Sequence, residues 1–377
     1  MRLLHLTTFL QGGAGLAIAE LASSQAALGH DVTVIASETG APGYGNYPAH
    51  LDTLARANVP VMLVDSSFKR DFAQNAAVVR SVLGLTENHG FDLIHTHAAT
   101  PSLIALIAAG RSTRRAPILQ TMHGWGMAKS AADAQADVAI LNLLDRVVVP
   151  AESSALLLRS LGVRRTPISI VPYGVRDDAP SPTRATDGLL DELRHWRANG
   201  GRVLCCLGTI GERKNQQLVI KALQRIEHRD RLLVVFVGDG DATALREQAS
   251  AAGVAGSIRI AGYREDTRAF LGTSDAFVLP SLSEGQPLSI LEAWREGLPV
   301  IVSDIPELRE LVDDGVTGYL FDPRCARALA SAISEAGRLS PAARLRMATR
   351  VRRIYDMRFA AGDMVAGYMN EYAAVAA

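Results

Sequence analysis

The stretch that decides the fold is residues 2–35, RLLHLTTFLQGGAGLAIAELASSQAALGHDVTVI. It begins with a short apolar run, Arg2–Leu6, and continues through the glycine-rich segment Gln11–Gly15. Residues 16–28 carry apolar side chains at helical spacing and stop before Gly29, a residue type that commonly closes a helix. Asp31–Ile35 is a second apolar run. A strand, a glycine loop, a helix and a strand in this order predict a βαβ unit.

The same alternation of strand-like and helix-like segments recurs along the rest of the chain. It is typical of a parallel sheet that helices cover on both faces. The further strands expected in the first half are Asp92–His95, Ile118–Met122, Arg146–Val149 and Ile168–Val171. In the second half, the expected elements are strands at Arg202–Leu207, Leu232–Val237, Ser257–Ile260, Asp275–Leu279 and Pro299–Val302, and a helix at Gln216–Ile226.

The alternation is interrupted over Pro172–Asp191, a polar, proline-rich stretch that contains the pair Asp177-Asp178. Such a composition indicates a linker or a domain edge, and we expect the aspartate pair to be a solvated turn. The sequence therefore predicts two α/β domains, 1–175 and 176–357. Residues 358–377 are expected to form a helix that packs back onto the N-terminal domain. Ligands of open parallel sheets bind beyond the carboxyl ends of the strands, so a cleft between the domains is the expected ligand site.

Composition narrows the classes of function. Of the 377 residues, 48% are hydrophobic and 21% are charged, which is typical of a globular protein and excludes a disordered or fibrous one. The 39 Lys and Arg residues balance 39 Asp and Glu residues, a poor basis for binding nucleic acid. The three cysteines fit neither a disulfide framework nor a four-ligand zinc site. No targeting or membrane-spanning segment is recognisable, so a cytoplasmic location is expected. The basic clusters Arg111–Arg115 and Arg164-Arg165 would allow at most a peripheral membrane contact.

The glycine-rich segment Gly12–Gly15 has two interpretations. Consecutive N–H groups at a helix N-terminus favour an anion such as a phosphate, whereas glycines are equally typical of a tight turn. Glu38 lies where a dinucleotide-binding protein contacts ribose, so an NAD-dependent dehydrogenase is an alternative. It is a weak one, because the G-x-G-x-x-G pattern would need a third glycine where Ile18 stands.

Three histidines, His95, His97 and His123, end or follow predicted strands, and we expect them at the rim of the ligand site. The plainer interpretation is that they are surface histidines or hydrogen-bonded core histidines. A metal site is not expected here, since no carboxylate lies at a short spacing that would complete one.

Two segments of the second half carry the strongest chemical signal. Arg213-Lys214 lies between a predicted strand and a helix, where two cations suit a diphosphate, although a solvated turn is the plainer interpretation of such a pair. Lys214 is expected to be an exposed loop cation. Glu284–Glu292, EGQPLSILE, places two carboxylates with seven residues between them around the start of a helix that Pro287 opens. These carboxylates would address hydroxyl groups at different depths of one ligand.

The segment Glu284–Glu292 resembles the E-x7-E signature of retaining glycosyltransferases with the two-domain GT-B fold, in particular glycosyltransferase family 4. The resemblance covers nearly the whole chain. The other similar motifs are Gly12-Gly13, Gly29–Val32, Asp92–His97, Val171–Val175, Val237–Gly240, Ala261–Tyr263, Ser274-Asp275, Gly297–Val300 and Asp314–Gly318. The resemblance implies a GT-B fold of two Rossmann-like domains. It also implies transfer of a hexose from a UDP- or GDP-linked sugar to a hydroxyl acceptor, with retention of the anomeric configuration.

In the second domain the resemblance implies a donor site. Glu292 would accept hydrogen bonds from the ribose, Glu284 would hold the donor sugar, and Lys214 would neutralise the phosphates. The rest of this site is backbone: Gly285, Gln286 and Pro287 at the sugar, Leu288 and Ser289 at the diphosphate, and Gly262, Tyr263 and Arg264 at the base.

In the first domain the resemblance implies contacts to the sugar side of the substrate. Gly12 and Gly13 would contact the diphosphate or the sugar, and His123 would lie beside the transferred sugar. His97 and Trp125 are candidates for the acceptor side, and loops at 40–47 and 125–130 are expected to shape the acceptor pocket. The acceptor would be a glycan, a lipid-linked sugar or a small molecule.

Two positions depart from the family pattern. Thr209 stands where the family has an arginine for the phosphates, and Arg213 is the expected substitute. Tyr173 replaces an asparagine before Gly174, and the sequence assigns no consequence to this change. With Arg213, Lys214 and a helix N-terminus at the leaving diphosphate, no metal or other cofactor is expected. A sugar-nucleotide epimerase on the same fold remains an alternative.

Overall fold

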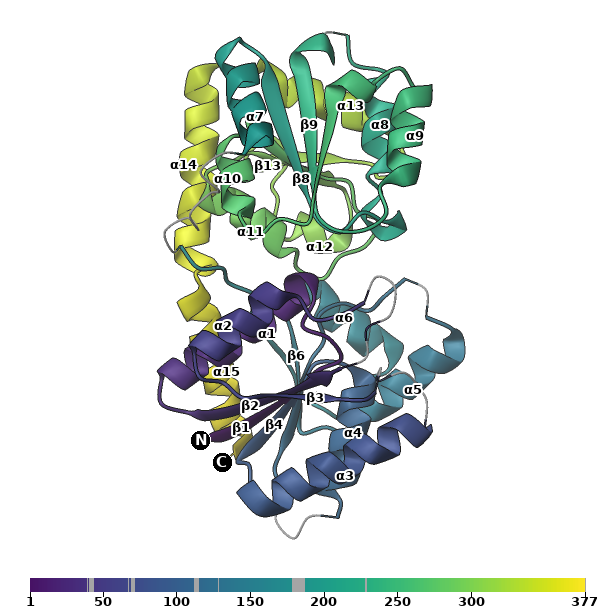
Figure 1. Cartoon of the computed structure of the whole chain (residues 1–377), viewed down its shortest axis with the longest axis vertical. Helices are drawn as coiled ribbons and strands as arrows, with labels where there is room; N and C mark the ends of the chain where they lie inside the picture. Colours follow the sequence, from purple (N-terminus) through teal and green to yellow (C-terminus); the bar gives the residue numbers. More distant parts are fainter. Residues whose placement is uncertain are drawn as a thin grey trace. The chain divides into compact units, whose positions relative to one another are not determined.

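The computed structural model describes residues 1–38, 40, 44–66, 68, 72–111, 115–127, 129–177, 187–227 and 229–376. The chain divides into two compact units, each built on its own sheet (Figure 1). Unit 1 consists of Met1–Gly174 and Ala361–Ala377, and unit 2 consists of Val175–Ala360. The chain therefore passes from one unit to the other twice. Asp178, the inner part of the loop at 40–47, Ala128 and most of the cluster at 111–115 lie outside the described residues.

The described part of unit 1 contains a seven-stranded sheet in the order β3-β2-β1-β4-β5-β6-β7, and all its pairings are parallel. The strands are β1 (Arg2–Leu6), β2 (Asp31–Ser37), β3 (Val61–Val64), β4 (Leu93–Thr96), β5 (Ile118–Thr121), β6 (Arg146–Val149) and β7 (Ile168–Ile170). The helices are α1 (Gly12–Ala27), α2 (Pro48–Arg56), α3 (Phe72–His89), α4 (Ala99–Ala109), α5 (Ala131–Leu141), α6 (Glu152–Leu161) and α15 (Ala361–Ala376).

The two faces of this sheet differ in chemistry. Side chains alternate along a strand, so Leu4 and Leu6 of β1 point to one face and His5 points to the other. Leu4 and Leu6 belong to an apolar core cluster that also includes side chains of α3, α4, α5 and α6. Figure 1 shows α1 and α15 on the opposite side of the sheet. The face under α1 and α15 is the one that receives the buried ring of His5.

The described part of unit 2 contains a six-stranded parallel sheet in the order β10-β9-β8-β11-β12-β13. The strands are β8 (Arg202–Leu207), β9 (Leu232–Val237), β10 (Ile258–Gly262), β11 (Ala276–Leu279), β12 (Val300–Ser303) and β13 (Gly318–Phe321). The helices are α7 (Gly188–Ala198), α8 (Gln217–Leu223), α9 (Thr243–Ala251), α10 (Thr267–Gly272), α11 (Leu288–Arg295), α12 (Pro306–Arg309), α13 (Ala326–Arg338) and α14 (Pro341–Arg358), with short 3-10 turns at Glu212–Lys214, Arg229–Arg231 and Ala255–Ser257.

The predicted class, two α/β sheets of parallel strands, is confirmed, and two strands are additional. β3 and β13 lie at the ends of their sheets. Met62 and Leu63 of β3 are exposed. The predicted glycine loop at Gln11–Gly15 is wrong in part, because α1 already begins at Gly12.

The last two helices of the chain belong to different units. α14 ends at Arg358 and belongs to unit 2, whereas α15 begins at Ala361 and belongs to unit 1. Between them, Ala360 forms a parallel bridge with Val175, so the two places where the chain changes unit lie next to each other. Among the described residues, no helix combines the length and the apolar character needed to cross a bilayer.

Candidate active site

The loops at the carboxyl ends of β8 and β9 in unit 2 approach each other so closely that only glycine fits. Gly208 and Gly238 both have positive φ angles, of 147° and 152°. A Cβ on Gly238 would lie 2.2 Å from the carbonyl oxygen of Gly208. A Cβ on Gly208 would in turn lie 3.3 Å from Cε of Lys214, so this edge of the sheet sets the position of the lysine.

Lys214 and Glu284 form an ion pair at this edge. Nζ of Lys214 lies 2.7 Å from Oε1 of Glu284, and Nη1 of Arg213 lies 3.0 Å from Oε2. The Glu284 side chain is 5% exposed, that of Lys214 is 14% exposed and that of Arg213 is 48% exposed. Burial by itself raises the pKa of the Glu284 carboxyl, but Lys214 and Arg213 outweigh it and hold the pKa below its ordinary value. The expectation that Lys214 is an exposed loop cation is therefore wrong.

Asn215 holds the two loops of this ion pair together, and the sequence analysis did not identify it. Its side-chain amide donates to the carbonyl oxygens of Pro280 and Pro323, each at 3.1 Å. Its φ angle is 55°, in the left-handed region that asparagine tolerates better than most residues. The backbone N–H of Leu282 also donates to the carbonyl oxygen of Arg213 at 2.8 Å. The cation pair is thus fixed by backbone contacts on both sides.

The segment between the two glutamates leads into α11. Glu284, Gln286 and Leu288 are buried, and α11 begins at Leu288 with Pro287 as its N-cap. The first N–H groups of an α-helix have no partner within the helix, and the helix dipole makes this end attractive to anions. Leu288 and Ser289 contribute such N–H groups, which lie in the sequence directly after the loop that carries Glu284.

Glu292 lies one turn into α11, and its carboxylate is only partly used by the protein. Oγ1 of Thr267 donates to Oε1 of Glu292 at 3.1 Å. The second carboxylate oxygen receives no hydrogen bond from any residue that the structure describes. Burial raises the pKa of the Glu292 carboxyl, although Arg295 and Thr267 oppose the rise. One oxygen thus remains to accept a hydrogen bond from a ligand.

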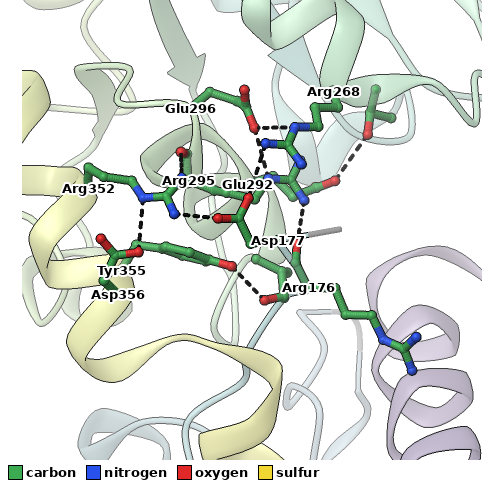
Figure 2. Close-up of polar contacts among 11 residues, drawn as sticks. Arg176, Asp177, Arg268, Glu292, Arg295, Glu296, Arg352, Tyr355 and Asp356 are labelled. Atoms are coloured by element: carbon green, nitrogen blue, oxygen red, sulfur yellow. Dashed lines mark hydrogen bonds and ion pairs between the residues drawn. The ribbon is translucent and has the colours of Figure 1, made fainter. Parts of the chain in front are cut away.

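Glu292 borders an ion-pair network that anchors the start of unit 2 (Figure 2). Asp177 pairs with Arg352 of α14 and, at 3.1 Å, with Arg268 of α10. Arg295 of α11 donates to the carbonyl oxygen of Arg176 at 2.8 Å. The expected solvated turn at Asp177 is therefore wrong, because two arginines hold this carboxylate and keep its pKa low.

A depression of about 370 Å³ lies beside the carboxyl ends of β9 and β10. Ile210, Gly238, Gly240 and Gly262 contribute to its wall. Tyr263 next to it is 40% exposed. The Arg264 side chain is directed to Asp187 and to Asp266, the latter at 2.7 Å. The predicted base-binding backbone thus borders an open depression.

Thr209 and Arg213, which both lie in the loop after β8, differ in their contacts. Thr209 is exposed, and its carbonyl oxygen accepts a hydrogen bond from Gln216 at 3.0 Å. Arg213 donates to the carbonyl oxygen of Ser283 at 2.9 Å as well as to Glu284. Arg213 is thus the guanidinium that lies beside the Lys214–Glu284 pair.

In unit 1, packing within the unit explains one glycine of the segment Gly12–Gly15. A Cβ on Gly15 would lie 2.4 Å from the backbone of Leu10, so this position requires glycine for packing alone. Gly12 has a φ of 55°, and a Cβ there would meet open space. Gly13 is exposed in the first turn of α1. Gly12 and Gly13, rather than Gly15, are therefore the positions open to a ligand.

The predicted rim histidines are mostly buried, and His5 joins them. His5 and His95 are 0% exposed and His97 is 7% exposed, while His123 is partly exposed. The three buried rings are close together: one nitrogen atom from each of His5, His95 and His97 lies within 4.8 Å of the other two. Both ring nitrogens of all three are in hydrogen-bond contact with other side chains, so the structure uses them as hydrogen-bonding groups.

Trp125, the second acceptor-side candidate, is partly buried. Its side chain packs against the core cluster of unit 1. Nζ of Lys129 lies 3.8 Å from the centre of its ring, a cation–π contact. Both observations give Trp125 a packing role.

Comparisons with known proteins bear on both halves of the chain. Residues 11–179 match the domain model "Glycosyltransferase Family 4", and residues 201–337 match "Glycosyl transferases group 1". The chain is 26% identical over 305 residues to the UDP-Gal:alpha-D-GlcNAc-diphosphoundecaprenol alpha-1,3-galactosyltransferase of Escherichia coli, covering 78% of this chain and 76% of the relative. It is also 26% identical over 349 residues to the D-inositol 3-phosphate glycosyltransferase of Kribbella flavida, covering 82% and 78%.

A solved structure shares the fold. Anabaena Alr3699/HepE, crystallised in complex with UDP and glucose, aligns with a TM-score of 0.84 and 20% identity over 99% of this chain and 100% of that one. The named relatives are glycosyltransferases, and they give no support to an epimerase or a dehydrogenase. The chain is therefore a glycosyltransferase of the GT-B fold, with a family 4 domain in its first half and a group 1 domain in its second.

Proposed function

We propose that this glycosyltransferase transfers a hexose from a UDP-linked sugar to a hydroxyl acceptor and retains the anomeric configuration. The observation that carries the proposal is the Lys214–Glu284 pair beside the start of α11, with Arg213 on its outer side. This arrangement combines two cations, a helix N-terminus and a buried carboxylate within one loop cluster. A diphosphate and the sugar attached to it require those groups.

The nucleotide would occupy the same edge of the sheet. Glu292 would use its second carboxylate oxygen for the ribose hydroxyls. The backbone of Gly262, Tyr263 and Arg264, beside the depression at β9 and β10, would hold the base. HepE was crystallised with UDP, and the Escherichia coli relative is named for UDP-Gal, which favours uridine.

The chemical problem is the separation of charge. The transferred sugar becomes positively charged while the nucleoside diphosphate leaves with growing negative charge. Lys214, Arg213 and the N–H groups of Leu288 and Ser289 would stabilise the leaving group, and preorganised donors of this kind are worth about 2.7–4 kcal/mol each. Glu284 would exchange part of its contact with the cations for the sugar hydroxyls. The acceptor would then attack from the same face, assisted by the leaving phosphate.

In unit 1, we propose that Gly13 and His123 contact the donor sugar or its diphosphate. The acceptor would be a hydroxyl group on a glycan, a lipid-linked sugar or a small molecule. The Escherichia coli and Kribbella relatives are named for a diphosphoundecaprenol-linked sugar and for an inositol phosphate, which supports this range of hydroxyl acceptors.

Calorimetric titration tests the donor site. UDP and UDP-hexoses are expected to bind more tightly than GDP, and Glu284→Gln is expected to retain UDP binding while losing sugar transfer. Glu212→Gln, an exposed glutamate in the same loop, serves as the control. NMR of the product's anomeric proton tests retention. An inverted product, or a Glu284→Gln variant with normal transfer, would contradict the proposal. Formation of an epimer from UDP-sugar alone would favour an epimerase.

A further inference from the structure

A continuous line of hydrogen bonds crosses the buried α1 and α15 face of unit 1. It runs from Gln25 through His5, His97 and His123 to Tyr173. Oε1 of Gln25 lies 2.8 Å from Nε2 of His5, and Nδ1 of His5 lies 3.0 Å from Nε2 of His97. Nδ1 of His97 lies 3.1 Å from Nε2 of His123, and Nδ1 of His123 lies 2.5 Å from the Tyr173 hydroxyl. We call these five side chains the histidine wire.

The wire has few ways to satisfy its hydrogen bonds. Each of its four links needs one proton, and three neutral imidazoles supply three, so an end group must supply the fourth. Either Tyr173 donates and all three rings carry the proton on Nε2, or Gln25 donates and all three carry it on Nδ1. The protonated nitrogen of a histidine is set by the bond that the other nitrogen makes, so the end groups decide the state of every ring.

The Gln25 end selects one of these two states. The amide nitrogen of Gln25 donates to the Tyr372 hydroxyl at 3.1 Å, so its carbonyl oxygen faces His5 and accepts. His5 therefore carries its proton on Nε2, and the same holds for His97 and His123. Tyr173 is then the donor to Nδ1 of His123. Gln25 is 0% exposed and Tyr173 is 4% exposed, so solvent offers neither end an easy substitute partner.

We propose that Tyr173, His97 and His5 are positioning residues for His123, and that they fix its ring as the neutral Nε2–H tautomer with both nitrogens occupied. This inference rests on the proposed function in one respect, the location of His123 beside the transferred sugar. There the ring would serve as an uncharged wall and not as a proton donor or acceptor. A charged ring at this place would oppose the positive charge that develops on the sugar.

Two further observations agree. Burial lowers the pKa of both His5 and His123 to about 4, so that neutral rings are favoured at physiological pH. Tyr173 also stands where the resembling family has asparagine, so the end group of the wire is a feature of this chain's own sequence. In this proposal the Tyr173 hydroxyl group donates the hydrogen bond that fixes the His123 ring.

NMR of the protein with ring-15N-labelled histidine tests the wire without any assay of activity. At pH 7, His123 is expected to show a protonated Nε2 and an unprotonated Nδ1, with the signals assigned by their loss in His123→Gln. In Tyr173→Phe the Nδ1 of His123 loses its donor, and the tautomer is expected to become mixed. Tyr368→Phe is the matched control, because its buried hydroxyl bonds Thr121 and lies off the wire. A charged or Nδ1-protonated His123 in the wild type, or a spectrum that Tyr173→Phe leaves unchanged, overturns the proposal.

Kinetics separate this proposal from the proposed function. Tyr173→Phe is expected to lower kcat by about tenfold or less, the equivalent of one neutral hydrogen bond, with a smaller change in the KM for the donor. If His123→Ala transfers sugar at the wild-type rate while the NMR shows the fixed tautomer, the wire stands and the place of His123 beside the sugar is wrong. If the tautomer is not fixed, the wire is wrong whatever the rates are.

Discussion

Replacement of Lys214 by alanine should destabilise unit 2 as well as stop the reaction. At 2.7 Å, and with an effective dielectric constant of about 20, the attraction between Lys214 and Glu284 is about 6 kcal/mol before desolvation is counted. Removing one partner of a buried ion pair costs about 3–5 kcal/mol, because the other charge stays buried. Arg213 remains beside Glu284 but is half exposed, so we expect a loss near the lower end, about 3 kcal/mol.

The loss should depend on pH in a defined direction. In the wild type the pKa of Glu284 is lowered, so its contribution to stability is present above the unfolded value of about 4.3 and is lost as the pH falls through the folded value. Without Lys214, burial would prevail and raise this pKa, so that the carboxyl becomes protonated in the folded variant at mildly acidic pH. The difference in unfolding free energy between the wild type and Lys214→Ala should therefore shrink from pH 7.5 to pH 5.

Urea unfolding followed by tryptophan fluorescence measures this difference, since Trp196 and Trp294 both lie in unit 2. Lys221→Ala, on the exposed side of α8, is the control and should stay within about 0.5 kcal/mol of the wild type. Lys214→Ala combined with Glu284→Gln should recover most of the lost stability, because the buried charge is gone. A Lys214→Ala variant as stable as the wild type, or a double variant no better than the single one, would refute the reasoning.

Unit 2 is the subject of the further predictions. Arg213→Ala should lower kcat by an amount equivalent to about 2–4 kcal/mol, and adding Thr209→Arg should restore part of it; strict additivity in this double-mutant cycle would show that Arg213 does not serve the diphosphate. Glu292→Ala should weaken UDP binding about 10- to 150-fold in calorimetry, with exposed Glu247→Ala as the control. Because the pKa of Glu292 is raised and the ionised form accepts the ribose hydrogen bonds, wild-type UDP affinity should fall on mild acidification, and constant affinity down to pH 5 would argue against this role. EDTA should leave transfer unchanged; loss of activity that Mg²⁺ restores would reveal a metal requirement. Asp177→Asn should lower the unfolding free energy by about 1 kcal/mol or less, with a smaller effect at 1 M salt, because the lost ion pairs are partly exposed.

Most strands could be predicted because they are compact apolar runs. Arg2–Leu6, Arg146–Val149, Arg202–Leu207 and Leu232–Val237 begin and end where the sequence predicts. The first turn of α1 was missed, since glycine weakens a helix and the local sequence therefore favours a loop at Gly12.

The site was predictable where a chemical motif is continuous in sequence. The sequence indicates two such motifs, Arg213-Lys214 and Glu284–Glu292, and the structure brings Arg213, Lys214 and Glu284 together. The burial of Lys214 and Glu284 was not predictable, because their two loops meet through contacts of Asn215 that lie far apart in sequence.

The histidine cluster could also be predicted only in part. His95, His97 and His123 were singled out because they stand at strand ends, whereas His5 lies within a strand and carries no such signal. Their hydrogen bonds depend on Gln25 of α1 and Tyr372 of α15, which no spacing rule connects to them.

The division of unit 1 into two separate segments bears on how the protein folds during synthesis. Tyr372 of α15 packs on the face that holds His5 and His95, and α15 is made only after all of unit 2. At about 5–20 residues per second, the ribosome needs roughly 10–40 s for unit 2. During that time the nascent first segment lacks the contacts of α15 on this face, while unit 2, which is continuous in sequence, can fold as soon as it emerges. Unit 1 can therefore be completed only after unit 2 has been synthesised.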